Sequence, residues 1–362
     1  MTAIIILLLL ALVFVYINGF HDTANSIATV VGTKVLTPRQ AIILATVTNL
    51  AGALVGTAVA ATIAHDLVDA RVITIHTIIC ALLGAIVWDL LTWWWGLPTS
   101  SSHALVGGLC GAALASAHGN WGEIIWANPA GTHWWEGQGV FFKVIIPMFV
   151  SPLLGFVAAF LVSGVLYALL RNWTLERVDQ VFGKLQIVSA GYMGFAHGNN
   201  DAQKTMGVVV LALVAATNAG TFDQVPGWLG FLRTSEGAAS ELTVAPWLKI
   251  ACALALAAGT AAGGWRIIQT MRRRITDLKP IHGFAAETTA ATVLTGAAAL
   301  GFPVSTTHAI TAAIAGVGAS RRFNALHLGV IERILWAWVL TLPAAALVAY
   351  LAMQGLRALG LK

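Results

Sequence analysis

The chain contains the sequence GLPTSSSHA at residues 96–104 and, 205 residues later, the sequence GFPVSTTHA at residues 301–309. In both copies a proline ends one helix, and Ser and Thr residues that favour a helix start follow it at once. Two more matches keep the same order: the glycine pair at 52 and 56 returns at 259 and 263, and residues 19–25 return at 198–204. Three ordered matches indicate two related halves, which we place at 1–170 and 171–362.

The composition is typical of a membrane protein. Of the 362 residues, 58% are hydrophobic and 10% are charged, and the mean hydropathy is +0.82. Soluble domains carry about 25% charged residues, so lipid is the expected solvent. Cys80, Cys110 and Cys252 are widely spaced within apolar stretches, which predicts neither a disulfide framework nor a metal site. The formal net charge of +5 follows a topological pattern, and we expect no nucleic-acid partner.

Each half is predicted to contain four helical units. They are 2–36, 40–64, 73–117 and 140–170 in the first half, and 182–217, 243–265, 282–319 and 331–358 in the second. The third unit of each half contains the proline turn and is predicted to be a hairpin that returns to the side it left. About 20 residues cross a membrane, so 2–36 and 182–217 are predicted to be single crossings broken at their polar centres.

Three crossings in each half, an odd number, invert the second half relative to the first. The predicted fold class is therefore an all-α polytopic membrane protein of two inverted-topology repeats with broken helices and helical hairpins. Thirteen of the twenty basic residues lie in segments that this topology puts on one face. They are Lys34, Arg39, Arg171, Arg177, Lys184, Arg266, Arg272, Arg273, Arg274, Lys279, Arg321, Arg322 and Arg333. Such an excess marks the cytoplasmic face, which predicts that both termini lie outside.

Two aspartates, Asp22 and Asp201, lie in the middle of apolar segments. A charge at a helix centre costs roughly 2.5–3.5 kcal/mol on insertion scales, and such residues are functional by default. Neighbouring glycines permit unwound backbone whose carbonyls bind cations. We therefore interpret both aspartates, with His21 and Asn200 beside them, as candidate sites for a coupling ion, either a proton or sodium.

Lys204 is the basic residue that this topology places inside the membrane. It is a candidate counter-charge for an anion. The alternative is a structural ion pair with Asp201 at i and i+3, which would leave Asp22 without a cation.

The two Ser/Thr turns are predicted to bind an oxyanion. The first N–H groups of a helix have no internal partner and carry partial positive charge, and hydroxyls add further donors. One turn from each half can face the other around a tetrahedral anion. The alternative is ordinary N-capping, but a cap needs one hydroxyl and each turn supplies three in succession.

Three further polar residues belong to these hairpins. Glu287 has Leu82 as its counterpart, so it breaks the symmetry of the halves; it is a candidate cation ligand or a partner for the aspartates. His103 and His308 end the two turns. Each is either a structural donor or a proton carrier, and the sequence leaves this open.

These motifs resemble those of the PiT family of inorganic phosphate transporters. The family's G-x-[NH]-D-x-x-[NK] signature matches residues 19–25 and 198–204, and its P-x-S-[ST]-[ST]-H turns match 98–103 and 303–308. The resemblance covers essentially the whole chain. It implies that Asp22 and Asp201 are cation or proton positions, and it implies a phosphate site formed by Asn25, Ser100, Ser101, Ser102, Lys204, Ser305, Thr306 and Thr307.

Two departures from the sodium-coupled members indicate the coupling ion. His21 and Lys204 stand where many of those members have Asn. This pattern resembles the bacterial low-affinity members, in which phosphate enters with protons and often as a neutral metal–phosphate complex. The resemblance thus implies a bacterial inner-membrane symporter, with no bound cofactor and protons favoured over sodium. The glycine pairs indicate close helix packing, either within one chain or between the copies of a homo-oligomer.

Three other functions fit parts of the sequence. A sulfate permease of the same superfamily is the closest, because sulfate is also a tetrahedral dianion; hydrogen phosphate, unlike sulfate, carries a donor that a carboxylate accepts. An intramembrane Ser/His/Asp hydrolase would need two active sites, and the chain has no G-x-S-x-G elbow. A passive channel would not require helices that meet at an inverted-repeat interface.

Overall fold

The structure is a computed structural model that describes residues 2–129, 133, 136–223, 226–234, 244–274, 278–321 and 327–360, apart from the side chains of residues 70 and 272–274. Some of the residues that underlie the predicted topology lie outside this description. These are both terminal residues, Arg322, and the side chains of Arg272, Arg273 and Arg274.

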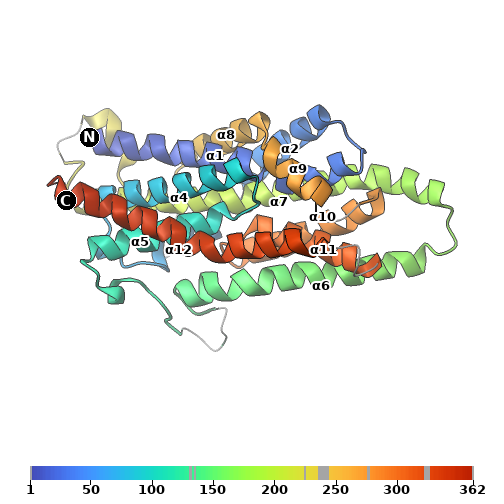
Figure 1. Ribbon diagram of the computed structural model, residues 1–362. Coiled ribbons are helices and arrows are strands. Elements are labelled where there is room, and N and C mark those ends of the chain that lie inside the picture. The colour runs from blue at the N-terminus through green and yellow to red at the C-terminus, as the bar shows by residue number, and fades with distance from the viewer. Residues whose placement is uncertain are drawn as a thin grey trace.

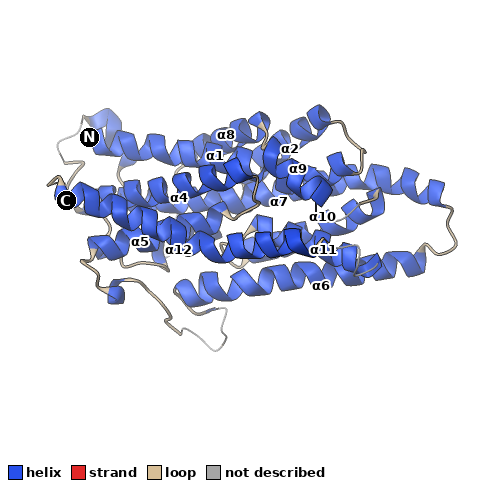
Figure 2. Ribbon diagram, in the orientation of Figure 1, coloured by secondary structure: helices blue, strands red, loops and turns tan. Residues whose placement is uncertain are grey.

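Helices account for most of the described chain, and loops connect them (Figure 2). The α-helices of the first half are α1 (Thr2–Gly32), α2 (Pro38–Ala53), α3 (Ala58–His65), α4 (Ile75–Trp95), α5 (Ser101–Ser116) and α6 (Ile146–Leu169). Those of the second half are α7 (Leu175–Asn218), α8 (Pro246–Ala262), α9 (Trp265–Arg274), α10 (Pro280–Ala299), α11 (Thr306–Arg321) and α12 (Leu328–Ala358). Three short 3-10 helices, η1 (Ala70–Val72), η2 (Trp121–Glu123) and η5 (Gly227–Leu232), and a short π-helix, η4 (Phe141–Ile145), complete the elements.

Each proline turn ends its helix through a glycine. Gly96 has φ of 67° and its N–H is bonded to the last turn of α4, and Gly301 has φ of 75°. This left-handed conformation favours glycine. The hydroxyls of Thr77 and Ser116 lie 2.7 Å apart, which joins the start of α4 to the end of α5. The first hairpin therefore returns to the side it left, as predicted, and α10 packs against α11 in the second.

The predicted breaks at the polar centres are wrong. Helix α1 runs unbroken through Asp22, and α7 runs unbroken through Asp201. The nearby glycines permit close packing rather than unwinding. A Cβ at Gly19 would overlap the backbone of α8, and a Cβ at Gly198 would overlap the backbone of α2.

The breaks occur instead in the units predicted as the simple helices 40–64 and 243–265. The first consists of α2 and α3, bent by 66°, and the second of α8 and α9, bent by 69°. Gly56 and Gly263, the second glycines of the two matched pairs, have φ of 81° and 73° at these bends. The physical reason is that such backbone angles exclude a straight helix and are readily adopted by glycine.

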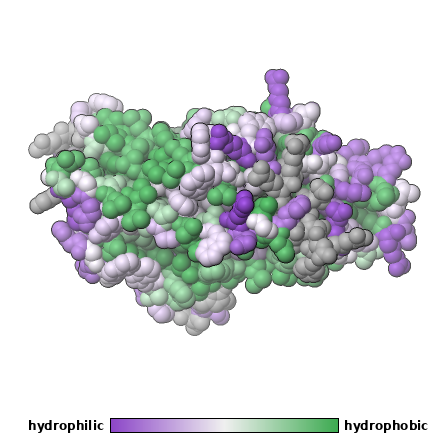
Figure 3. Space-filling view, viewed as in Figure 1, coloured by the Kyte–Doolittle hydropathy of each residue, from purple (hydrophilic) through white to green (hydrophobic). Residues whose placement is uncertain are grey.

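The chain is a multi-span membrane protein by helix length and surface. Four spans are long and apolar enough to cross: α1, α4, the η4–α6 segment and α12; each bent pair adds one more if it crosses as a unit. The long α7 is not among them, because its polar centre lowers its hydropathy. Large apolar side chains such as Phe149, Leu161 and Trp336 are exposed. Apolar side chains cover much of the body, and polar ones gather at the end where α6 joins α7 (Figure 3).

Helices of the two halves pack against each other rather than as separate bodies. Helix α1 lies against α8, where Gly259 meets the Tyr16 carbonyl; α2 lies against α7, where Gly52 meets the Phe195 carbonyl. These contacts fall within one chain, so the glycine pairs provide no argument for a homo-oligomer. Elements far apart in the sequence thus lie side by side along the bundle (Figure 1).

The two hairpins also pack against helices of the opposite half of the chain. Gly107 and Gly111 of α5 meet the carbonyls of Leu342 and Ala346 on α12. Gly316 of α11 meets the Phe156 carbonyl on α6. Each hairpin therefore packs against the terminal helix of the other half.

Replacing Gly52 by alanine should destabilise this packing, because the new Cβ would overlap the Phe195 carbonyl. Overpacking of this kind costs about 1–3 kcal/mol. We expect the detergent-solubilised Gly52→Ala protein to unfold at a lower temperature than the parent. Gly164→Ala on α6 is the matched control, since a Cβ there meets nothing within 4 Å. Equal unfolding temperatures for the two variants would contradict the close-packing role.

Candidate functional site

The predicted site residues on α1, α7 and the two turns meet at one buried centre. The start of α5 and the start of α11 point toward each other there. Their histidines, His103 and His308, are in edge-to-face contact with ring centroids 4.8 Å apart. Trp338 of α12 stacks on His308 and donates to the Pro98 carbonyl at 3.0 Å. The two turns are thus held against each other by aromatic rings, and both histidines pack within this contact.

One hydroxyl of each turn serves as the N-cap. The Ser100 hydroxyl accepts a hydrogen bond from the His103 N–H, and the Ser305 hydroxyl accepts one from the His308 N–H, each at 3.2 Å. An accepting hydroxyl keeps its own proton for another partner. The next two hydroxyls of each turn have other roles. Capping therefore uses one hydroxyl of each turn and leaves the other two for other contacts.

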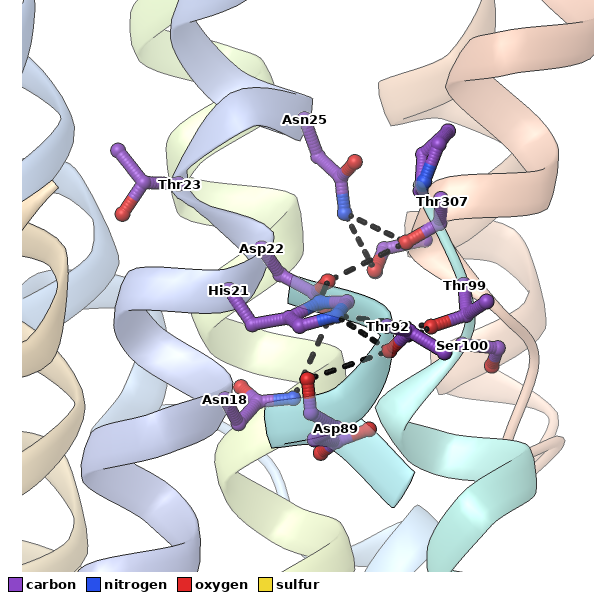
Figure 4. A network of polar contacts seen from close by, with 12 residues as sticks. Asn18, His21, Asp22, Thr23, Asn25, Asp89, Thr92, Thr99, Ser100 and Thr307 are labelled. Carbon is purple, nitrogen blue, oxygen red and sulfur yellow. Dashed lines mark hydrogen bonds and ion pairs between the residues drawn. The ribbon is translucent and has the colours of Figure 1, made fainter. Parts of the chain in front are cut away.

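Asp22 is held by groups from both halves of the chain. The Asn18 amide donates to it at 3.3 Å, and His21 Nδ1 lies 2.9 Å from Oδ1. From the other half, the Thr307 hydroxyl donates to Oδ1 at 3.3 Å. Figure 4 shows Asn25 and Thr307 on one side of the Asp22–His21 contact, and Asn18 and Asp89 on the other.

Asp201 has a comparable set of partners. Lys204 Nζ lies 2.5 Å from Oδ1, His197 Nε2 lies 3.1 Å from Oδ2, and the Thr306 hydroxyl donates to Oδ2 at 3.2 Å. The Asn18 amide also reaches Oδ2, at 3.4 Å. Asn18 therefore connects the two aspartates directly.

Lys204 links Asp201, in the second half, to the Ser/Thr turn of the first half. Its ammonium donates to Ser102, to the Val304 carbonyl at 2.8 Å and to Asp201. All three donors of the ammonium are used, and the side chain is 3% exposed. The structural ion pair considered from the sequence is present, yet the same ammonium also reaches both turns.

Asn25 completes the contacts between α1 and the second turn. Its amide donates to the Thr307 hydroxyl at 2.9 Å and to the Thr306 hydroxyl at 3.3 Å. These hydroxyls donate in turn to the two aspartates. All eight predicted substrate residues are buried, with exposed fractions of 3% or less. All eight are therefore enclosed by the described part of the chain.

Several buried polar atoms at the centre have no hydrogen-bond partner within the described residues. They belong to Ser101 (the hydroxyl), Asn200 (both amide atoms) and Asn18 (the amide oxygen). Buried polar groups are nearly always paired, because an unpaired group loses its hydration without compensation. Unpaired donors and acceptors here are therefore expected in a site that receives a polar ligand.

A cation could bind between the two aspartates. Asp22, His197 and Asp201 each offer a ligand atom, and these atoms lie within 4.8 Å of one another. The group combines carboxylate oxygens with an imidazole nitrogen. Hard cations prefer oxygen, whereas imidazole suits transition metals. Lys204 competes for the same Asp201 carboxylate.

Glu287 does not reach the aspartates. Its carboxylate contacts the hydroxyls of Thr29 and Ser189 and, at 3.4 Å, the Gln186 amide. These residues form a separate buried cluster of α1, α7 and α10, with Thr33 bonded to Gln186 at 2.8 Å. Of the two roles considered from the sequence, partnership with the aspartates is absent from this arrangement.

The sequence analysis missed Asp89, a fully buried aspartate of α4 beside the first turn. It lies in an apolar segment, so the argument that identified Asp22 would have identified it. Thr92 and Thr99 were also missed; their hydroxyls lie 3.2 and 3.5 Å from His21 Nε2. Thr92 is an isolated threonine in an apolar helix and carries no comparable sequence signal, whereas Thr99 lies within the first proline turn, directly before Ser100.

Comparison with known proteins identifies the family. The profile described as "Phosphate transporter family" matches residues 18–349. A probable low-affinity inorganic phosphate transporter of Rhizobium meliloti (strain 1021) is 44% identical over 346 residues, which cover 95% of this chain and 94% of the relative. Its counterpart in Bacillus subtilis (strain 168) is 39% identical over 344 residues, 94% and 93% of the two chains.

A solved structure shares the fold. "The sodium-dependent phosphate transporter" superimposes with a TM-score of 0.80 at 24% identity, covering 99% of this chain and 100% of that one. The matches confirm the resemblance seen in the motifs, and the family consists of transporters, so the hydrolase interpretation is excluded. The chain belongs to the phosphate transporter family, the PiT family of its motifs.

Proposed function

We propose that this protein imports inorganic phosphate by proton symport. The observation that carries the proposal is the convergence of two hydroxyl turns, two aspartates and one lysine on a single closed centre. Hydroxyl and ammonium donors suit a tetrahedral oxyanion. Carboxylates beside them can accept the proton of hydrogen phosphate, which sulfate lacks. The names of the relatives support the same substrate.

The coupling follows from competition for donors. Thr306, Thr307 and Lys204 donate to Asp201 or Asp22 in this conformation. A phosphate that enters between the turns needs the same donors. A proton on either carboxylate removes its negative charge and weakens its hold on them. Phosphate binding and protonation of the aspartates are therefore favourable together.

The residues beside the aspartates support protons over sodium. Imidazole nitrogens of His21 and His197 contact the carboxylates, and nitrogen is a poor ligand for a hard cation. The Lys204 ammonium already occupies the position of a cation beside Asp201. A divalent metal carried with phosphate is a second form of the cargo, for which Asp22, His197 and Asp201 offer ligands.

The proposed topology is that of two inverted halves, 1–170 and 171–362, in a bacterial inner membrane. The two labelled chain ends lie at one end of the bundle, and the α6–α7 connection lies at the other (Figure 1). That connection carries Arg171, and the first turn of α7 carries Arg177, which supports a cytoplasmic position for this end and an external position for the termini. Because α5 packs on α12 and α6 on α11, the units that move during transport draw helices from both halves.

Ser101→Ala should weaken phosphate binding without unfolding the protein. The Ser101 hydroxyl has no partner within the described residues and does not cap α5. Loss of one hydrogen bond to a charged ligand costs roughly 1.5–3 kcal/mol, so we expect the KM for phosphate to rise about tenfold or more. Ser163→Ala on α6 is the matched control, since it removes another unpartnered buried hydroxyl. An unchanged KM in Ser101→Ala would contradict a ligand role for this hydroxyl.

Asp201→Asn should abolish uptake driven by a proton gradient. The substitution removes the carboxylate that holds Lys204 and Thr306 and with it a proton site, and loss of a proton-transfer group typically costs about 10²–10⁴-fold in rate. Accumulation of labelled phosphate in proteoliposomes measures this. The control is Asp179→Asn at the exposed start of the same helix. Near-normal accumulation in Asp201→Asn would refute the coupling role.

One uptake assay can identify both the substrate and the coupling ion. We expect excess sulfate to leave phosphate uptake unchanged and an uncoupler of the proton gradient to collapse it, with or without sodium. Efficient competition by sulfate would identify a sulfate permease instead. Uptake that survives the uncoupler and needs sodium would indicate sodium symport, and survival without sodium would indicate a channel. Stimulation by added divalent metal would identify the metal–phosphate complex as cargo.

A further inference from the structure

A pocket lined by basic residues lies at the end of the bundle where α6 joins α7. Its volume is about 560 Å³, and it is formed by the end of α6, the starts of α7 and α10, and the end of α11. This end lies opposite the labelled chain ends (Figure 1). None of the described residues that line the pocket belongs to the central site. The pocket is therefore a separate feature of the molecule.

The charge of the pocket favours an anionic ligand. Three exposed basic side chains line it: Arg171 in the α6–α7 connection, Lys279 directly before α10, and Arg321 at the end of α11. Neither Arg171 nor Lys279 forms an ion pair with a carboxylate of the described residues. Asp179 is the carboxylate among the described lining residues, so positive charge is in excess. The starts of α7 and α10 add partial positive charge.

Much of the remaining lining is apolar. Val178 and Ile281 are buried against each other's cluster, and Leu170 and Trp173 pack against them. The Arg177 guanidinium lies 4.3 Å from the centroid of a Trp173 ring, which fixes the indole at the edge of the pocket. A free phosphate ion has no apolar part that could cover these side chains. A phospholipid carries its phosphate next to apolar chains, so it matches both parts of the lining.

Hydrogen bonds join the walls of the pocket. The Lys279 N–H donates to Nδ1 of His282 at 2.9 Å, and Nε2 of the same ring lies 2.8 Å from the Tyr167 hydroxyl. A ring nitrogen that accepts a hydrogen bond carries no proton. The imidazole is therefore neutral, and the positive charge comes from the arginines and the lysine. These bonds connect α6 to α10, so the pocket is formed before a ligand binds.

The pocket lies at the expected depth of lipid headgroups. Helix α6 exposes apolar side chains such as Val165 and Leu169, which suit a lipid-facing surface. The basic residues begin two positions later, at Arg171. Tyr167 and Trp173 lie on either side of this change, and such aromatic residues are enriched at the membrane–water interface. Polar side chains gather at this end of the molecule (Figure 3).

We propose that this pocket binds the phosphate headgroup of an anionic phospholipid. Arg171 and Lys279 contact the headgroup phosphate, and the apolar lining contacts the start of the acyl chains. Basic pockets between membrane helices on the cytoplasmic side suit such headgroups. Under the proposed topology the lipid belongs to the inner leaflet. It contacts α6 and α7 together with α10 and α11, and so joins the two halves of the chain at this end.

The test is a titration of the purified, delipidated protein with phosphatidylglycerol, phosphatidylcholine or inorganic phosphate. Native mass spectrometry identifies each bound ligand by its mass. We expect the parent to bind phosphatidylglycerol more tightly than phosphatidylcholine. In the double variant Arg171→Gln and Lys279→Gln, affinity for phosphatidylglycerol should fall roughly thirtyfold, about fivefold for each basic residue near an anionic lipid.

The matched control is the double variant Arg39→Gln and Lys184→Gln. It removes the same charge from exposed residues of the same predicted face that do not line the pocket, and it should match the parent. Asp179→Asn tests the opposite direction, because it removes the carboxylate of the pocket. Affinity for phosphatidylglycerol should then rise roughly fivefold, the same charge change with the opposite sign. Misfolding cannot produce such a gain.

Three results would overturn the assignment. One is equal affinity of the parent and the pocket double variant for phosphatidylglycerol. Another is an equal loss in the pocket and control variants, which would indicate general attraction to a basic surface. The third is a loss of bound inorganic phosphate in the pocket variant with phosphatidylglycerol binding unchanged, which would make the ligand free phosphate. Inorganic phosphate at the central site should bind alike in all of these variants.

Discussion

The structure depends on one constraint: the donors that an anion would need are already engaged by the protein's own carboxylates. Lys204, Thr306 and Thr307 come from different parts of the chain and converge on Asp22 and Asp201. Buried charges are tolerated only when they are paired and hydrogen-bonded. The same pairing makes the closed centre stable when it holds no substrate. Under the proposed function, neutralising the carboxylates would free these donors for phosphate, so stability and transport would depend on the same few contacts.

Much of the site was predictable because its residues are costly in a membrane. Asp22, Asp201 and Lys204 stand out in apolar sequence, and the repeated turns identify their partners across the two halves. The division of labour within each turn was not predictable, because all three hydroxyls are chemically alike and only geometry assigns Ser100 and Ser305 to capping. Asp89 was missed although it carries the same signal as Asp22. An aspartate in an apolar segment is itself a signal, but the position 205 residues later is Leu294, so the repeat does not mark Asp89.

The fold was less predictable wherever glycine had two possible uses. Glycine permits both an unwound backbone and the close approach of another helix, and sequence alone does not distinguish them. Gly19 and Gly198 serve close approach, whereas Gly56 and Gly263 serve the bends. Helix lengths and the two hairpins followed from hydropathy and proline. The choice of packing partners, α1 with α8 and α2 with α7, depends on contacts between residues far apart in the chain.

The interleaving of the halves has a consequence for synthesis on the ribosome. Helix α1 enters the membrane first, yet its partner α8 ends at Ala262, and Thr307, which donates to Asp22, follows 285 residues after that aspartate. During that interval Asp22 has two partners on its own helix: Asn18, one turn earlier, and the adjacent His21. A nascent first half therefore cannot complete its packing before most of the second half is made. Asn18 and His21 therefore stabilise the buried Asp22 carboxylate before Thr307 has been synthesised and inserted.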